Sequence, residues 1–348
     1  TFNRFDKAMT QSLEFTKATV QSQQPESLQS LAVLWARKYY LSVAANQAPE
    51  QPQPDQNLTE TASIESRKIT ADKLVKHLNL ASAKAWSLTE TLLSEEMQRH
   101  NIDPELINPL EIATDTRELF YKALDAYASG VPPQRLSVMV GKNCGRVRKK
   151  YTSVDPRAIG FVSMQFHYTG QKLLEWLSPD DQKVFAPYLK VMDDHMYMPL
   201  QAAYEAAAEH EIDSPLLLAV QNLLPISTTI AYEVCQSVSR QHPGYQSYSG
   251  ALTAEKVKIS SIRDVEMFQV YLCLCVLDRN IRSVQQQLFP LCVMLYPCLK
   301  VSWKLVQEML LFMSWEIQER LPLQHVPIFL PYLRTFSEMF SHEVFKDE

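Results

Sequence analysis

A dense group of basic residues lies in the 23-residue stretch RLSVMVGKNCGRVRKKYTSVDPR, at positions 135–157. The stretch holds one acidic residue, although the whole chain carries a formal net charge of -5. Clustered cations bind phosphate groups or acidic protein surfaces, so this stretch is the first candidate for a functional site. Its basic residues are Arg135, Lys142, Arg146, Arg148, Lys149, Lys150 and Arg157.

The periodicity of the basic stretch favours an α-helix. Apolar residues recur at helical steps of 4, 4, 3 and 4, at Leu136, Val140, Cys144, Val147 and Tyr151. Three positions also match part of a helix-turn-helix over 133–152, an element that binds DNA. They hold a small residue, a glycine four positions later and an apolar residue six positions beyond that. This match is incomplete, because Lys142 follows the turn glycine where an apolar residue is usual.

The same stretch has features of three other kinds of structure or site. A phosphate-binding Walker loop is excluded, because in GKNCG the lysine follows the first glycine and not the second. Cys144 has cationic neighbours that favour a reactive thiolate, but its place in the apolar stripe favours burial. Alternating apolar residues over 136–140 and 162–168 allow a β-hairpin, which the helical pattern fits less well.

A second charged stretch, at positions 193–213, is acidic and contains no lysine or arginine. Acidic residues with two histidines invite a metal site, but the Glu-x-x-His pairs of helical carboxylate sites do not occur here. We therefore expect an acidic surface that docks a partner, or one that pairs internally with the basic stretch. Its acidic residues are Asp193, Asp194, Glu205, Glu209, Glu211 and Asp213.

Outside these two stretches the sequence offers little that could catalyse a reaction. His167 lies between aromatic neighbours, in MQFHYTG, which is typical of a hydrogen-bonded core histidine. No HExxH metal motif, Gly-rich dinucleotide loop or Ser-His-Asp spacing occurs. We expect a protein that is not an enzyme and that has no bound cofactor or metal.

The elements that position these residues are predicted to be helices. The chain has 348 residues and seven glycines, five of them between 130 and 170, and its glycine-poor segments have a 3.6-residue apolar period. Serine followed by proline at Ser178 and Ser214 predicts two helix starts. The predicted fold is an all-α multi-helix bundle with a tethered N-terminal helical pair. Its predicted parts are the pair at 1–46, a flexible Pro/Gln linker at 47–60, a helical segment at 61–157 that ends in the basic stretch, and a C-terminal bundle at 158–348.

Cysteine usage and apolar run lengths predict a cytoplasmic protein. Six cysteines without CxxC or secreted spacing predict a reducing compartment. The N-terminal residues lack the apolar core of a signal peptide, so none is expected. The run LFPLCVMLYPCL at 288–299 is shorter than the ~20 residues that span a bilayer. We therefore expect a core helix there and no transmembrane segment.

Two runs, VRKKYTSVDPRAIGFVSMQFHYTGQ and DDHMYMPLQAAYEAAA, resemble uncharacterised soluble proteins of cyanobacteria. The resemblance covers about residues 130–345. It implies a setting in the cytoplasm or at the cytoplasmic face of thylakoids, and it implies no activity or site residues.

The charged stretches lead to the expected function. We expect an interaction, assembly or regulatory factor that binds a protein partner or a second copy through the surfaces at 135–157 and 193–213. One alternative is a DNA-binding regulator that contacts nucleic acid through 133–152. The other is a helical protein that binds a metal or a small ligand.

Overall fold

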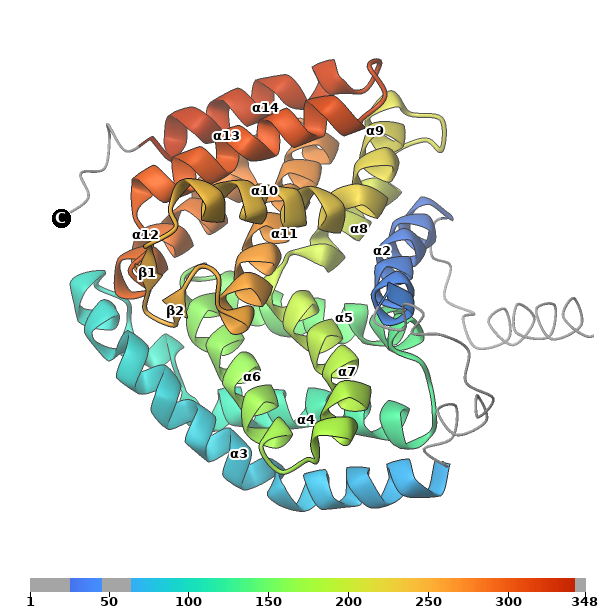
Figure 1. The fold of residues 1–348 in the computed structure, drawn as a ribbon, viewed down its shortest axis with the longest axis vertical. Coiled ribbons are helices and arrows are strands. Elements are labelled where there is room, and N and C mark those ends of the chain that lie inside the picture. The colour runs from blue at the N-terminus through green and yellow to red at the C-terminus, as the bar shows by residue number, and fades with distance from the viewer. Residues whose placement is uncertain (1–25, 46–63, 342–348) are drawn as a thin grey trace, which may run out of the picture.

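The protein is built almost entirely from α-helices, as the sequence predicts (Figure 1). The computed structural model describes residues 26–45 and 64–341. The first helix of the expected N-terminal pair and the linker expected at 47–60 lie outside these residues. Within them, the only sheet is one antiparallel pair of two-residue strands. The all-α prediction is confirmed.

The helices form two groups along the chain. The first group is α2 (Glu26–Ala45), α3 (Ile64–Arg99), α4 (Pro109–Ala128), α5 (Pro133–Thr152), α6 (Ala158–Leu174) and α7 (Pro179–Tyr197). The second group is α8 (Leu200–Ala208), α9 (Pro215–Leu223), α10 (Ser227–Gln241), α11 (Glu255–Asp278), α12 (Phe289–Cys298), α13 (Trp303–Arg320) and α14 (Val326–Met339). The shorter elements are the 3-10 turns η1 (Pro104–Leu106) and η2 (Leu224–Ile226), the π turn η3 (Val284–Leu288), and the strands β1 (Gln246–Ser247) and β2 (Gly250–Ala251).

Local sequence explains where several helices begin. Ser178 caps α7, because its hydroxyl accepts a hydrogen bond from the Asp181 amide, and proline follows at the first helical position. Asn108 caps α4 in the same way. Ser214 and its proline begin α9, although the Ser214 side chain makes no capping bond. Both helix starts predicted from Ser-Pro pairs are confirmed.

Helix α11 lies at the centre of the molecule. It packs against α8, α9, α10 and α14, and every residue from Val265 to Leu277 is buried. The long α3 lies along one edge of the ribbon in Figure 1, and α13 and α14 lie along the opposite edge. One hydrophobic core runs from Leu31 to Phe340, so the division expected at residue 157 does not separate two cores.

Helix α2 belongs to the body of the protein. It packs against α5, α7 and α8, and the side chains of Leu31, Trp35 and Tyr39 are buried. Burying three large side chains against the rest of the core stabilises this position by several kcal/mol, at about 1.5–3 kcal/mol for each. Helix α2 of the expected N-terminal pair therefore packs on the body of the protein.

The glycine-rich region is helical. Helix α5 runs unbroken from Pro133 to Thr152 and α6 follows it, so the helical interpretation is confirmed and the β-hairpin is wrong. Gly145 permits the close approach of α5 to α8, since a Cβ atom there would lie 2.5 Å from Cβ of Gln201. Glycine in this region serves helix packing, which explains why it does not mark an irregular segment.

One stretch of the described residues, Pro215–Gln241, is long and apolar enough to cross a membrane. It combines α9, η2 and α10, and 44% of its most apolar window is buried inside the molecule. A core helix passes the same test of length and composition. The run at 288–299, expected to be a core helix, forms α12 with Leu291, Cys292 and Met294 buried.

Candidate functional site

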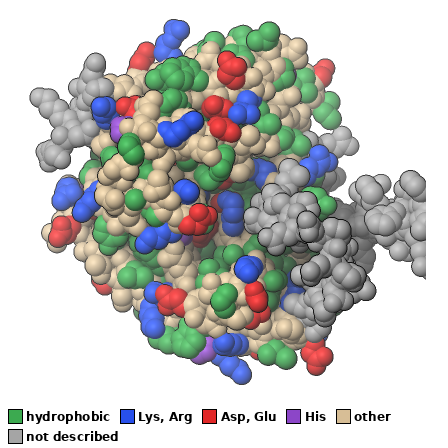
Figure 2. All heavy atoms as spheres, in the orientation of Figure 1, with side chains coloured by type: hydrophobic (Ala, Val, Ile, Leu, Met, Phe, Trp, Pro, Cys, Tyr) green, Lys and Arg blue, Asp and Glu red, His purple; other side chains and the backbone are tan. Residues whose placement is uncertain are grey.

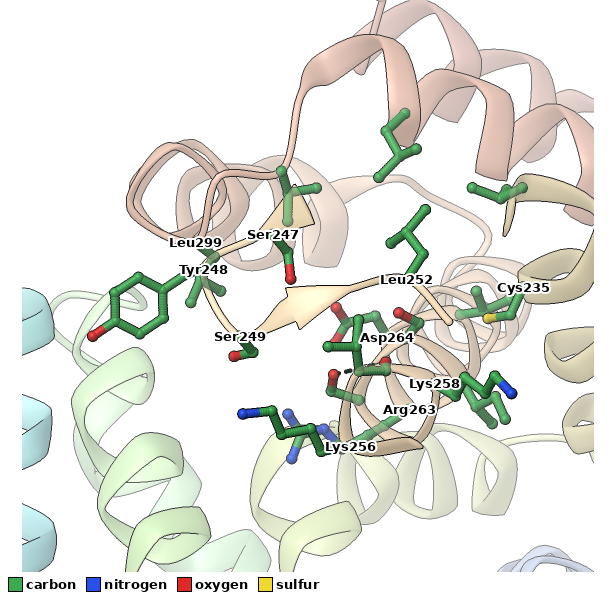
Figure 3. Close-up of a pocket in the computed structure, with 18 of the residues that line it drawn as sticks. Cys235, Ser247, Tyr248, Ser249, Leu252, Lys256, Lys258, Arg263, Asp264 and Leu299 are labelled. Carbon is green, nitrogen blue, oxygen red and sulfur yellow. Dashed lines mark hydrogen bonds between the residues drawn. The ribbon is translucent and has the colours of Figure 1, made fainter. Parts of the chain in front are cut away.

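A cavity of about 660 Å³ lies beneath the β1–β2 hairpin (Figure 3). Its walls come from α6, α10, the N-terminal half of α11, and α13. The hairpin is held in place because the Tyr248 amide donates to the Leu299 carbonyl and the Tyr245 hydroxyl donates to the Lys300 carbonyl, both at 2.9 Å. A cavity of this volume accommodates a small organic molecule.

The lining of the cavity combines apolar surface with cationic side chains. Leu305, Val306 and Met309 of α13 supply apolar surface. Among the described residues that line it, the single carboxylate is that of Asp264. Four cationic side chains also line it, those of Arg240, Lys256, Lys258 and Arg263. The cavity therefore has an excess of positive charge.

Arg263 of α11 is the most enclosed of these cations. Its Nη1 lies 3.5 Å from Asp193 Oδ2, and its guanidinium carbon lies 4.2 Å from the centre of the Tyr197 ring. Its Nε is buried and has no hydrogen-bond partner. Nearby carboxylates and Tyr197 raise the pKa of Arg263 although its burial acts to lower it, so the guanidinium is charged with a donor left over.

Lys256 lies one to two turns before Arg263 on α11. In Figure 3 its amine end and the Arg263 guanidinium lie on the same side of the helix. Lys256 is exposed and makes no ion pair with any described residue. The pair forms a cationic end of the cavity that has free donors.

His167 of α6 lies at the cavity wall beside this cationic end. Its Nδ1 is 2.9 Å from Asp193 Oδ2, and its Nε2 is 2.8 Å from the Gln171 amide nitrogen. Burial would raise the pKa of Asp193, but His167 and Arg263 outweigh it and lower that pKa. The histidine is hydrogen-bonded as expected, but it is half-buried against the cavity and not within the core.

Asp264 and Tyr197 form a separate polar pair in the cavity wall. The Tyr197 hydroxyl donates to Asp264 Oδ1 at 2.8 Å, and Asp264 makes no ion pair with any described residue. Burial raises the pKa of the Asp264 carboxyl and that of the Tyr197 hydroxyl. This carboxylate is the one negative group that an anionic ligand would meet.

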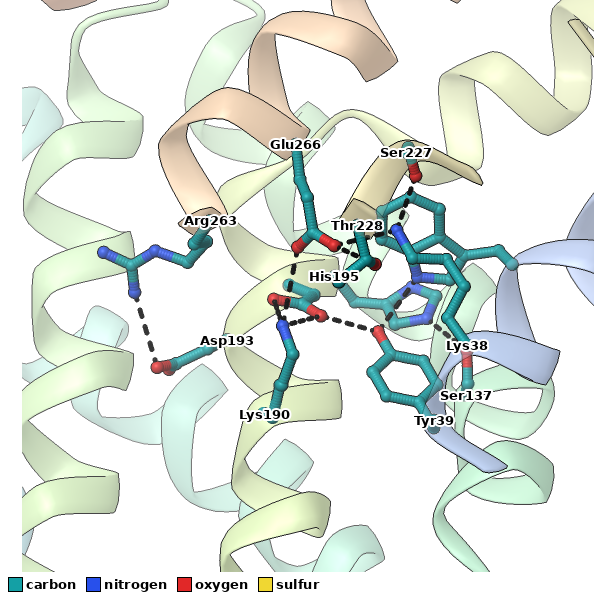
Figure 4. A network of polar contacts seen from close by, with 12 residues as sticks. Lys38, Tyr39, Ser137, Lys190, Asp193, His195, Ser227, Thr228, Arg263 and Glu266 are labelled. Carbon is teal, nitrogen blue, oxygen red and sulfur yellow. Dashed lines mark hydrogen bonds and ion pairs between the residues drawn. The ribbon is translucent and has the colours of Figure 1, made fainter. Parts of the chain in front are cut away.

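A second polar assembly, the central charge cluster, lies deeper and is formed by Lys38, Lys190, Asp194 and Glu266 (Figure 4). Lys38 of α2 contacts Glu266 of α11 at 2.9 Å, and Lys190 of α7 contacts Asp194 at 2.9 Å and Glu266 at 3.5 Å. The Tyr39 hydroxyl donates to Asp194 at 2.9 Å, and the Thr228 hydroxyl donates to Glu266.

The central charge cluster is electrically balanced. Burial would raise the pKa of Glu266, but Lys38 and Lys190 lower it to about 2. Burial raises the pKa of Asp194 and lowers that of Lys38, each against the opposing charges around it. Two ammonium groups face two carboxylates, and all except Lys190 are almost fully enclosed. Removal of one partner from such a balanced buried set would leave an uncompensated buried charge, so the cluster joins α2, α7 and α11 only while all four groups are present.

Some of the residues predicted on the two charged surfaces are exposed in the structure, and others are buried or paired. Arg148 and Asp194 were expected outward and are buried, which is a correction to both surfaces. Arg148 continues the buried stripe one turn after Cys144, and it donates to the Met196 carbonyl. Asp194 faces Lys190 within the central charge cluster. Asp193 is partly buried between His167 and Arg263.

Two further basic residues pair with acids outside the 193–213 stretch. Lys150 contacts Glu111 and Asp115 of α4, both at 2.7 Å, and Arg157 contacts Asp155 at 2.7 Å. The rest of both predicted sets is exposed and makes no ion pair with a described residue: Arg135, Lys142, Arg146 and Lys149, and Glu205, Glu209, Glu211 and Asp213. On the face drawn in Figure 2, side chains of both signs are interspersed.

The remaining chemistry proposed for the basic stretch is not supported by its geometry. Helix α5 continues through Gly141, so the turn that a helix-turn-helix needs there is absent. Gly141 and Ser137 lie on the buried side of α5, against His195 of α7. Burial raises the pKa of Cys144 to about 12, so this thiol is not activated. No group of three His, Cys, Asp or Glu side chains among the described residues is placed to hold a metal ion.

Several residues of the site were not singled out from the sequence. They are Lys38, Tyr39, Lys190, Tyr197, Lys256, Arg263, Asp264 and Glu266. The available signal was charge inside apolar helices: IRDVEMFQV places Arg263, Asp264 and Glu266 directly before the fully buried half of α11 and at its first residues. Charged residues in such a context are rarely buried unless they are paired or functional.

Comparison with protein-family models, with curated proteins and with solved structures finds no match to this chain.

Proposed function

We propose that the protein binds a small organic anion with an apolar portion in the cavity beneath the β1–β2 hairpin, and that it acts as a binding protein and not as an enzyme. The observation that carries this proposal is the charge of the lining, four cations against one carboxylate. The unfilled Nε donor of the partly buried Arg263 adds to it. Arg240, Lys256 and Lys258 are exposed and make no ion pair with a described residue, so a bound anion would gain charge-assisted contacts with them.

The apolar and cationic parts of the lining favour a ligand of mixed character. The anionic group would lie near Lys256 and Arg263, where charge-assisted hydrogen bonds are strong in a partly enclosed site. The apolar portion would contact Leu305, Val306 and Met309. His167 is hydrogen-bonded to Asp193 through Nδ1 and to Gln171 through Nε2, which fixes the orientation of its ring at the cavity wall.

A pair of fluorescent probes tests the proposal. 8-Anilinonaphthalene-1-sulfonate is an apolar anion, and N-phenyl-1-naphthylamine has the same rings without the sulfonate. We expect the protein to bind the sulfonate more tightly than the neutral probe. In the variant Arg263→Met the affinity for the sulfonate should fall about 10- to 100-fold, because one charge-assisted hydrogen bond contributes roughly 1.5–3 kcal/mol. The affinity for the neutral probe should not change.

A matched control is Lys84→Met, which removes an exposed cation of α3 outside the cavity lining. This variant should bind both probes as the wild type does. Circular dichroism and urea unfolding establish that each variant is folded, since loosened proteins also bind the sulfonate. Equal affinity for the two probes in the wild type, or an unchanged sulfonate affinity in Arg263→Met, would contradict the proposal.

The interaction role expected from the charged stretches remains a prediction. It no longer depends on Arg148 and Asp194, which are buried. The DNA-binding alternative has lost the turn on which it depended.

A further inference from the structure

The exposed remainder of the two charged stretches forms two faces of equal and opposite charge. The basic face consists of Arg135, Lys142, Arg146 and Lys149, which lie on the solvent side of α5 at helical spacing. The acidic face consists of Glu205 and Glu209 at α8 and Glu211 and Asp213 in the turn that follows. None of the eight makes an ion pair with a described residue.

The two faces adjoin at Gln201. On one side Gln201 packs against Gly145, the residue before Arg146. On the other side its amide donates to Glu205 at 3.1 Å. A surface that changes sign across this line presents four positive charges next to four negative charges.

Each face also exposes apolar side chains. Val138 and Met139 of α5 are 49% and 54% exposed among the basic residues, and Ile212 is 63% exposed among the acidic ones. Apolar contacts surrounded by complementary charge are typical of protein interfaces.

We propose that these two faces bind a second copy of this chain in a two-fold symmetric dimer. In such an interface the same surface is used by both subunits, so the basic face of one copy meets the acidic face of the other. All eight unpaired charges of each subunit then gain partners of opposite sign. A polyanion such as DNA or an anionic membrane would be attracted by the basic face and repelled by the acidic face beside it.

Analytical ultracentrifugation at low salt and at 1 M NaCl provides the first measurement. We expect a dimer at low salt that dissociates at 1 M, because the Debye length falls from about 10 Å at 0.1 M to about 3 Å at 1 M. A chain that stays monomeric at high concentration in low salt would overturn the proposal.

Charge reversal then tests which surfaces meet. The acidic variant Lys142→Glu/Arg146→Glu and the basic variant Glu205→Lys/Glu209→Lys each reverse two of the four charges on one face and leave that face without net charge. Each variant alone should dimerise at least about 10-fold more weakly than the wild type, because like charges then face each other across the interface. Mixing the two variants in equal amounts should restore a dimer, now made of one copy of each.

A matched control changes the same net charge elsewhere. Lys84→Glu/Lys304→Glu alters two exposed cations of α3 and α13, and it should dimerise as the wild type does. If this control weakens association equally, or if the mixed variants stay monomeric, the assignment of these faces is wrong. Binding of the naphthalene sulfonate probe should persist in all variants, so this test and the cavity test fail independently.

Discussion

The central charge cluster and the cationic end of the cavity both include residues of α11 but differ in charge compensation. Asp193 and Asp194 are adjacent on α7, and Arg263 and Glu266 are one turn apart on α11. In Figure 4 the Arg263–Asp193 pair lies to one side and the contacts of Lys38 with Glu266 lie to the other, with Lys190 between them. The deep group has equal numbers of cations and carboxylates, whereas the cavity side has more cations than carboxylates.

This difference separates a structural role from a binding role. A closed set of buried charges stabilises the fold only while every partner is present. A group of charges with unfilled hydrogen-bond donors contributes less to the stability of the fold, and its donors remain available to bind a ligand. Substitution of the deep group should therefore change stability, and substitution at the cavity should change binding.

The largest expected effect follows from Glu266→Gln. This change leaves Lys38 and Lys190 with less compensation in a buried setting, which costs about 3–5 kcal/mol. Urea unfolding followed by circular dichroism measures the change in the free energy of unfolding. The change Glu118→Gln, at an exposed residue of α4 that makes no ion pair with a described residue, serves as the control and should stay within about 0.5 kcal/mol of the wild type. Equal stability of the wild type and Glu266→Gln would remove the structural role of the cluster.

These two regions also show which features of the structure could be predicted from the sequence and which could not. The all-α fold followed from apolar periodicity, and α5 followed from the stripe at Leu136, Val140, Cys144 and Tyr151. Periodicity and capping are local properties, so one sequence is enough to read them. The stripe also passes through Arg148, whose burial depends on a carbonyl group 48 residues away.

The site itself depends on contacts between distant parts of the chain. Tyr39 meets Asp194 across 155 residues, and Lys38 meets Ser227 across 189. Contacts between residues so far apart in the sequence leave no local pattern. The sequence does show charge within apolar helices, at Lys190 and at Arg263 to Glu266, but it does not tell which of these charges would face one another and which would line a cavity.

A change of pH should have a smaller effect on the free energy of unfolding, and this effect again distinguishes the two regions. The pKa of Glu266 is lowered from 4.5 to about 2, so its charge contributes stability that is complete above about pH 4.5 and is lost as pH falls towards 2. This shift corresponds to about 3 kcal/mol. Asp194 and Asp264 have raised pKa values, so their protonation opposes this loss.

The comparison of wild type with Glu266→Gln isolates the contribution of Glu266 from those of the other carboxyls. Between pH 5 and pH 3 the free energy of unfolding should fall more steeply for the wild type than for Glu266→Gln. Urea titrations at several pH values measure both slopes. Parallel curves would show that Glu266 titrates normally and that the cluster does not depress its pKa.

The smallest expected effect comes from Asp264→Asn, the same kind of change made two residues earlier on α11. The Tyr197 hydroxyl can still donate to the amide oxygen, so its bond is kept. Burial disfavours the charged form of Asp264, as its raised pKa records, and stability at pH 7 should therefore stay equal or rise slightly. Loss of the one negative charge in the lining should strengthen binding of the naphthalene sulfonate about 3-fold, because a partly screened unit charge contributes below 1 kcal/mol.

The direction in which Asp264→Asn changes sulfonate affinity and stability distinguishes the cavity from the central charge cluster. At lower pH Asp264 becomes protonated in the wild type, so the difference in sulfonate affinity between wild type and variant should shrink. Affinity for the neutral naphthylamine should be equal in both proteins at every pH. Weaker sulfonate binding or a large loss of stability in Asp264→Asn would mean that Asp264 acts in the fold as Glu266 does. The two sides of α11 would then share one structural network, and the cationic end of the cavity would not be a separate binding site.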